Sequence, residues 1–128
     1  MWRLSKTQRR DIWEEEIQSP LGDIEAAKKI REICDAAADS AEKIRGVSRP
    51  PQGKKAKFEV ERYERAAKAA MEIAMKMSDE LMRDASVRRI VDLCMSANDM
   101  KTSRILFRAI QSPSILKAVV SDYPALGA

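Results

Sequence analysis

Histidine is absent from the 128 residues, and this absence excludes more functions than any other feature of the sequence. Without an imidazole there is no Ser-His-Asp type of triad, no zinc site with histidine ligands and no histidine acid–base catalysis. Glycine is scarce as well, and none of the four glycines belongs to a Gly-Lys-Ser/Thr phosphate-binding loop. We therefore expect a protein that is not an enzyme and has no catalytic residue, metal site or cofactor.

Long apolar runs and cysteines are also few. No apolar run exceeds three residues, so the sequence has neither a membrane-spanning segment nor the core of a signal peptide. The two cysteines, Cys34 and Cys94, each fall within an apolar helical pattern and do not resemble a secreted disulfide framework. We therefore expect free thiols in a cytoplasmic protein that does not associate with membranes.

The composition that remains is typical of a soluble helical protein, with 45% apolar and 34% charged residues but only 5% aromatic residues. A chain of this length predicts a single domain, residues 1–128, that is large enough to fold without a metal or a disulfide. Within it, the basic segment 47–57 contains Pro50, Pro51 and Gly53 and is the one obvious linker.

Two segments carry apolar residues at alternating spacings of three and four, which is the pattern of a helix that packs along one seam. They cover about residues 20–45 and 58–83 and predict an all-α fold. In this fold the two segments form a long antiparallel helical hairpin, with shorter N- and C-terminal helices packed on it. The same stripes could instead pair between two copies of the chain, and the spacing alone does not choose. The stripes are Ala27, Ile30, Cys34, Ala37, Ala41 and Ile44 in the first segment, and Val60, Tyr63, Ala67, Ala70, Ala74, Met77 and Leu81 in the second.

The shorter helices are predicted from capping residues and from proline. Ser5 predicts a helix to Gln18, Ser86 predicts one to Ala97, and Asn98-Asp99 predicts a turn and a new cap. The next helix covers Met100–Gln111. Ser112-Pro113 then opens a last helix that ends before Tyr123-Pro124.

The segment 58–83 has a wider apolar arc than one hairpin partner would cover. Methionines form a second stripe beside the heptad stripe, and flexible thioethers suit adaptable partner surfaces. Tryptophan on a short N-terminal helix is a common interface anchor. Core filling is the ordinary alternative for the methionines. The predicted partner interface of a homo-oligomer, or of a complex with another protein, is Trp13, Ile17, Met71, Met75 and Met82.

Basic residues gather in two places on a chain of net charge +4. The first place is the linker segment 47–57, which contains Lys54, Lys55 and Lys57. The second is the helix 100–111, where cations and an amide recur on one side, as on the recognition helix of a helix-turn-helix protein. The ordinary alternative is a solvated surface. The candidate nucleic-acid contacts are Lys54, Lys55, Lys57, Arg88, Arg89, Lys101, Arg104, Arg108 and Gln111.

Two functions follow from these features. The first is a non-catalytic helical interaction or regulatory protein that acts by protein–protein association or self-assembly. The alternative is a small nucleic-acid-binding protein with a helix-turn-helix-like C-terminal part, residues 86–111. The alternative requires that the cations of helix 100–111 stay exposed and are not neutralised by Asp84, Asp92 or Asp99.

Overall fold

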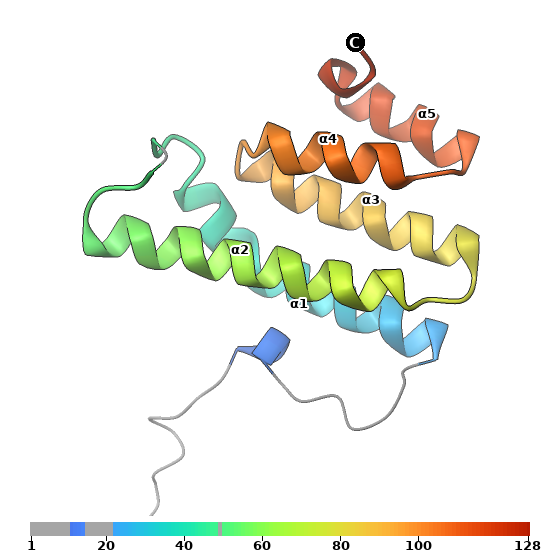
Figure 1. The fold of residues 1–128 in the computed structure, drawn as a ribbon, viewed down its shortest axis with the longest axis horizontal. Coiled ribbons are helices and arrows are strands. Elements are labelled where there is room, and N and C mark those ends of the chain that lie inside the picture. The colour runs from blue at the N-terminus through green and yellow to red at the C-terminus, as the bar shows by residue number, and fades with distance from the viewer. Residues whose placement is uncertain (1–10, 15–21, 49) are drawn as a thin grey trace, which may run out of the picture.

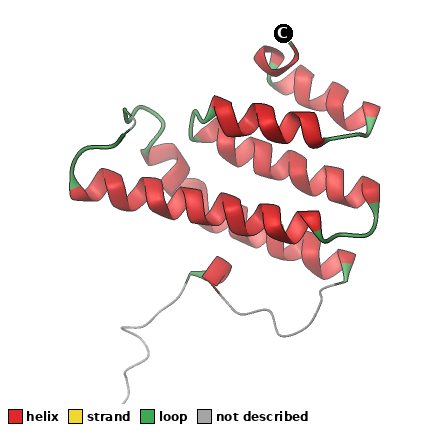
Figure 2. Ribbon diagram, in the orientation of Figure 1, coloured by secondary structure: helices red, strands yellow, loops and turns green. Residues whose placement is uncertain are grey.

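A computed structural model describes residues 11–14, 22–48 and 50–128 of the chain (Figure 1). Every regular element in these residues is a helix (Figure 2), so the predicted all-α class is confirmed. None of the helices in the described part of the chain is long and apolar enough to cross a membrane. The elements are η2 (Ile12–Glu14), α1 (Asp23–Lys43), α2 (Lys54–Met75), α3 (Glu80–Ser96), α4 (Met100–Ala109), α5 (Pro113–Asp122) and η3 (Pro124–Gly127).

The core lies among three helices, because α1 and α2 contact each other and both contact α3. In Figure 1, α2 lies in front of α1, with α3 and α4 beside this pair and α5 beyond them. Many core positions are alanines, whose small side chains let helix axes approach closely. The most deeply buried side chains include Ile30, Ile33 and Ala37 of α1, Tyr63, Ala66 and Ala70 of α2, and Val87, Ile90 and Val91 of α3.

The predicted helix 58–83 is wrong, because the chain forms two helices there. α2 ends at Met75 and α3 begins at Glu80. The Asp79 side chain caps α3 by accepting a hydrogen bond from the Met82 N–H at 2.8 Å. Asp23 of α1 accepts hydrogen bonds from the backbone N–H groups of residues 78 and 79, at 2.9 and 2.8 Å. These contacts from another helix hold the chain in a turn that the apolar periodicity does not reveal.

The break also moves two residues from their predicted places. Leu81, expected on the buried stripe, is 60% exposed near the start of α3. Ser86, expected to cap a helix, is buried in the middle of α3. The predicted cap falls inside the helix because α3 starts six residues earlier, at Glu80.

The predicted bounds of the first two helices also change. The predicted linker 47–57 is shorter in the structure, because α2 already begins at Lys54. Gly53 precedes the helix with φ +88°, a conformation that glycine adopts at little cost. The predicted helix 20–45 is α1, Asp23–Lys43. Of the predicted N-terminal helix 5–18, residues 5–10 and 15–18 lie outside the described residues, and Ile12–Glu14 form a short 3-10 turn.

The C-terminal part follows the predicted order. Asn98 adopts a left-handed conformation with φ +57°, and Asp99 caps α4 by accepting from the Thr102 N–H at 3.1 Å. α4 ends at Ala109 rather than at Gln111. Ser112 and Pro113 open α5, as predicted, and α5 ends at Asp122.

Candidate interaction surfaces

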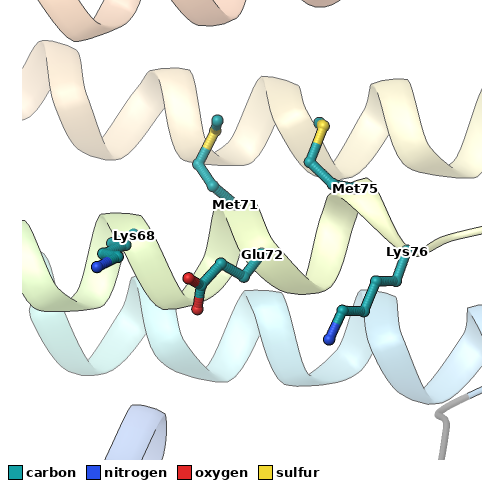
Figure 3. Close-up of a pocket in the computed structure, with 5 residues that line it drawn as sticks. All are labelled: Lys68, Met71, Glu72, Met75 and Lys76. Atoms are coloured by element: carbon teal, nitrogen blue, oxygen red, sulfur yellow. The ribbon is translucent and has the colours of Figure 1, made fainter.

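Met71 and Met75 lie one turn apart on the side of α2 that is turned toward α3, and Met71 packs against the core. Met71 is half-buried, and Met75 is 52% exposed. Figure 3 shows both side chains pointing toward α3, while Glu72 and Lys76 lie across the outer surface of the helix toward its other edge. These four residues and Lys68 line an open pocket of about 600 Å³.

Charged residues alternate in sign along the same surface. Glu64, Lys68, Glu72 and Lys76 recur every four residues, and all four are exposed. None of them forms an ion pair in the described part of the chain, although such a spacing permits one within a helix. Elsewhere the same spacing does pair Lys43 with Asp39 at 3.0 Å. We call Glu64, Lys68, Met71, Glu72, Met75 and Lys76 the α2 outer face.

The other residues of the predicted partner interface lie outside α2 in the sequence. Met82 belongs to α3, because the helix breaks before it, and it is half-buried against the core. Trp13 lies in η2 and also packs on the core. Ile17 lies outside the described residues. Of the five predicted residues, Met71 and Met75 share α2, and Met82 lies on the neighbouring helix α3.

Trp13 is held by Arg62, a residue that the sequence does not single out. The guanidinium carbon of Arg62 lies 4.9 Å from the centre of the Trp13 ring, within the range of a cation–π contact. Arg62 also donates to Asp11 Oδ1 at 2.9 Å, to the Ala36 carbonyl at 3.2 Å and to Ser40 Oγ at 3.0 Å. Arg62 therefore ties η2 to α1 and α2. These contacts join residues distant in sequence, and no local motif could have predicted them.

The cations predicted on α4 form an exposed surface. Lys101, Arg104 and Arg108 are all exposed, and none forms an ion pair within the described residues. We call these three residues the α4 basic face. Ile105 is 53% exposed beside them. Gln111 does not continue the face, because α4 ends before it.

The three aspartates near this face accept hydrogen bonds from other groups. They are Asp84, Asp92 and Asp99. Asp84 accepts from the backbone N–H groups of residues 111 and 112. Asp92 accepts from the Tyr123 hydroxyl at 2.8 Å, and Asp99 from the Tyr63 hydroxyl at 2.6 Å. The acids next to the α4 basic face therefore bind groups of the core and the C-terminus.

The remaining predicted nucleic-acid contacts are dispersed. Arg88 is paired with Asp122 at 2.9 Å, which ties α3 to α5. Arg89 is exposed on α3. Lys54, Lys55 and Lys57 are exposed in the first turn of α2, rather than in a flexible linker. Figure 1 shows α3 and α4 side by side and running in opposite directions.

The two thiols are free and buried. Burial raises the pKa of Cys34 and of Cys94 to about 12 each, because the charged thiolate is poorly solvated inside the protein. Both sulfurs therefore stay protonated at neutral pH, and the protonated form is a poor nucleophile. Over residues 11–14, 22–48 and 50–128, no group of three or more Cys, Asp or Glu side chains is placed to hold a metal ion.

Neither a protein-family model, nor a curated protein, nor a solved structure matches this chain. The function is therefore inferred from the chain's own surfaces.

Proposed function

We propose that this chain is a non-catalytic helical interaction protein that acts by self-association through the α2 outer face. The observation that carries the proposal is the exposure of Met75 beside the half-buried Met71, with charged side chains along one edge of this pair. An apolar centre with a polar rim is the usual anatomy of a protein–protein interface. Burial of apolar surface favours association by about 25 cal/mol per Å² of surface removed from water.

The charges of this face favour a second copy of the chain over a strongly charged partner. The face carries two acids, Glu64 and Glu72, and two bases, Lys68 and Lys76. A partner of one charge sign would meet as much repulsion as attraction there. A second copy offers both signs, so two copies can be arranged with acids opposite bases.

Sedimentation equilibrium of the wild type and of M75K tests the proposal. A lysine at position 75 would place an unpaired charge within an apolar contact, so we expect M75K to associate at least tenfold more weakly than the wild type. The matched control is F58K, because Phe58 is 61% exposed at the other end of α2. We expect F58K to associate like the wild type. Equal association of all three proteins would contradict the assignment of this face.

A second candidate function is nucleic-acid binding through the α4 basic face. It is favoured by the exposure of Lys101, Arg104 and Arg108 without an ion pair in the described part of the chain. Cations placed in this way can neutralise phosphates and release counterions. The two proposed surfaces share no residue, so each can be tested separately.

A further inference from the structure

Arg62 is oriented by contacts that lie within α1 and α2. Its Nη1 donates to the Ala36 carbonyl at 3.2 Å and to Ser40 Oγ at 3.0 Å. Ser40 is buried and donates in turn to Glu59 Oε1 at 2.7 Å. These partners all belong to α1 and α2, so the two helices fix the guanidinium without a contribution from η2. A group that is oriented in advance binds a ligand at a lower entropic cost.

The N-terminal segment uses what remains of the same guanidinium. Asp11 Oδ1 accepts from Nη2 at 2.9 Å, and the guanidinium carbon lies over the Trp13 ring, 4.9 Å from its centre. An arginine can bind a carboxylate and an aromatic ring together, because its donors point outward in its plane and its flat face stacks. Ile12, the residue between them, packs against the core. An acidic, an aliphatic and an aromatic residue in succession therefore fill one site.

η2 is a short element on the surface of the two long helices. It contacts α1 and α2, on the side of this pair that lies away from α3 in Figure 1. Residues 15–22 connect it to the start of α1. Its fit is incomplete, because Trp13 Nε1 is buried and has no hydrogen-bond partner in the described part of the chain. A buried donor without an acceptor weakens a contact, and a weakened contact favours exchange with another segment of similar chemistry.

We propose that the surface around Arg62 is a pre-formed site for a short peptide segment with an acidic residue two positions before an aromatic residue. The chain's own Asp11 and Trp13 occupy this site in cis, and a partner segment of the same chemistry has to displace them. The short connection gives the chain's own segment a high effective concentration, so the site is closed to weak competitors. The site shares no residue with the α2 outer face or the α4 basic face, so it does not depend on the proposed function.

A peptide titration tests the proposal. The variant D11A/W13A removes both contacts with Arg62, and the probe is the peptide of residues 11–14, acetylated and amidated so that its ends carry no charge. The backbone N–H signals of Ala36 and Ser40 in heteronuclear NMR spectra report binding beside Arg62. We expect the peptide to bind D11A/W13A at least tenfold more tightly than the wild type, in which the site is filled in cis.

Two controls isolate the chemistry of the site. The control peptide has alanine in place of its acidic first residue and its aromatic residue, and it should not shift the two signals. In the D11A/W13A background, R62M should lose binding of the probe peptide. R65M should retain it, since it removes an exposed arginine of the same helix whose ion pair is with Glu61.

Circular dichroism establishes whether D11A/W13A keeps its helices. If it loses them, the titration is repeated with W13A, which leaves Asp11 in place. Loss of the helices in both variants would overturn the proposal, because the site would not exist without the segment. Absence of binding to the variant, binding as tight to the wild type, equal binding of the two peptides, or binding retained in R62M would each overturn it as well.

Discussion

Asp84 is fully buried and accepts hydrogen bonds from the backbone N–H groups of Gln111 and Ser112, at 3.0 and 2.8 Å. Hydrogen bonds to a charged group are stronger than those between neutral groups. One carboxylate on α3 therefore satisfies two backbone donors where the chain leaves α4 and enters α5. This contact also explains why α4 ends two residues before the bound predicted from the sequence.

We expect D84A to lower the free energy of unfolding by about 3 kcal/mol, because it leaves two backbone N–H groups without their acceptor. Urea denaturation followed by circular dichroism measures the change. The control is D122A, which removes a half-exposed acid whose ion pair among the described residues is with Arg88. D122A should cost less than about 1 kcal/mol. A loss below this value in D84A would show that the buried contact is not formed.

The buried thiols predict a dependence of stability on pH. Their pKa values are raised from the ordinary 9.0 to about 12 in the folded chain, whereas the unfolded chain releases these protons near pH 9. The folded state therefore binds more protons than the unfolded state between pH 9 and pH 12, and its stability falls as the pH rises through that range. Below pH 9 this contribution is fully present.

We expect the free energy of unfolding to decrease between pH 8.5 and pH 10, as measured by urea denaturation at each pH. The double variant C34A/C94A is the control, and its stability should fall much less over the same range. Tyr63 also has a raised pKa, mainly through burial, but its ordinary value of 10.0 confines its contribution to higher pH. A wild type with constant stability from pH 8.5 to pH 10 would contradict the burial of the two thiols.

At the scale of the elements, the sequence predicts the class and order of the helices better than their bounds. Ala74, Met77 and Leu81 continue the heptad spacing through the break at residues 76–79, so periodicity predicts one helix where there are two. The capping residue Asp79 was a local sign of the break. The acceptor that holds the turn, Asp23, lies on another helix, and no local pattern reveals a contact over such a distance in sequence.

The α4 basic face predicts how nucleic-acid binding would respond to mutation. The variant R104A/R108A should weaken binding to a DNA duplex by about 2 to 4 kcal/mol, and the log–log salt slope should shrink by about two units. Fluorescence anisotropy at several salt concentrations measures both quantities. K117A, which removes an exposed cation of α5, is the control and should retain wild-type binding. Absence of duplex and single-strand binding at low salt would exclude this function.

For the whole molecule, the candidate surface could be predicted only in part. Met71 and Met75 share one helix, so their spacing sufficed to place them on one side. Met82 was grouped with them on a helical spacing continued past residue 75, but the helix break places it on α3. Trp13 was grouped with them as an interface anchor, but it contacts Arg62. Ile105 is exposed because α4 buries the side that carries Ser103 and Leu106. Which side of a short helix meets the core depends on the packing of the other helices, and this information is not local.

The two surfaces would act together in a dimer. Because they share no residue, association through α2 would leave one α4 basic face on each copy. Two linked faces bind a long polyanion more tightly than one, since the second contact becomes intramolecular. Self-association is thus the property on which this joint binding depends.

Sedimentation equilibrium of the wild-type chain, from about 1 to 200 µM, tests that property most directly. A contact of a few helical turns lies at the small end of stable interfaces, so we expect a reversible dimer with a Kd of roughly 10 to 100 µM. The apparent mass should rise from 14.4 kDa toward twice that value as the concentration increases. A constant mass of 14.4 kDa over the whole range would contradict the account.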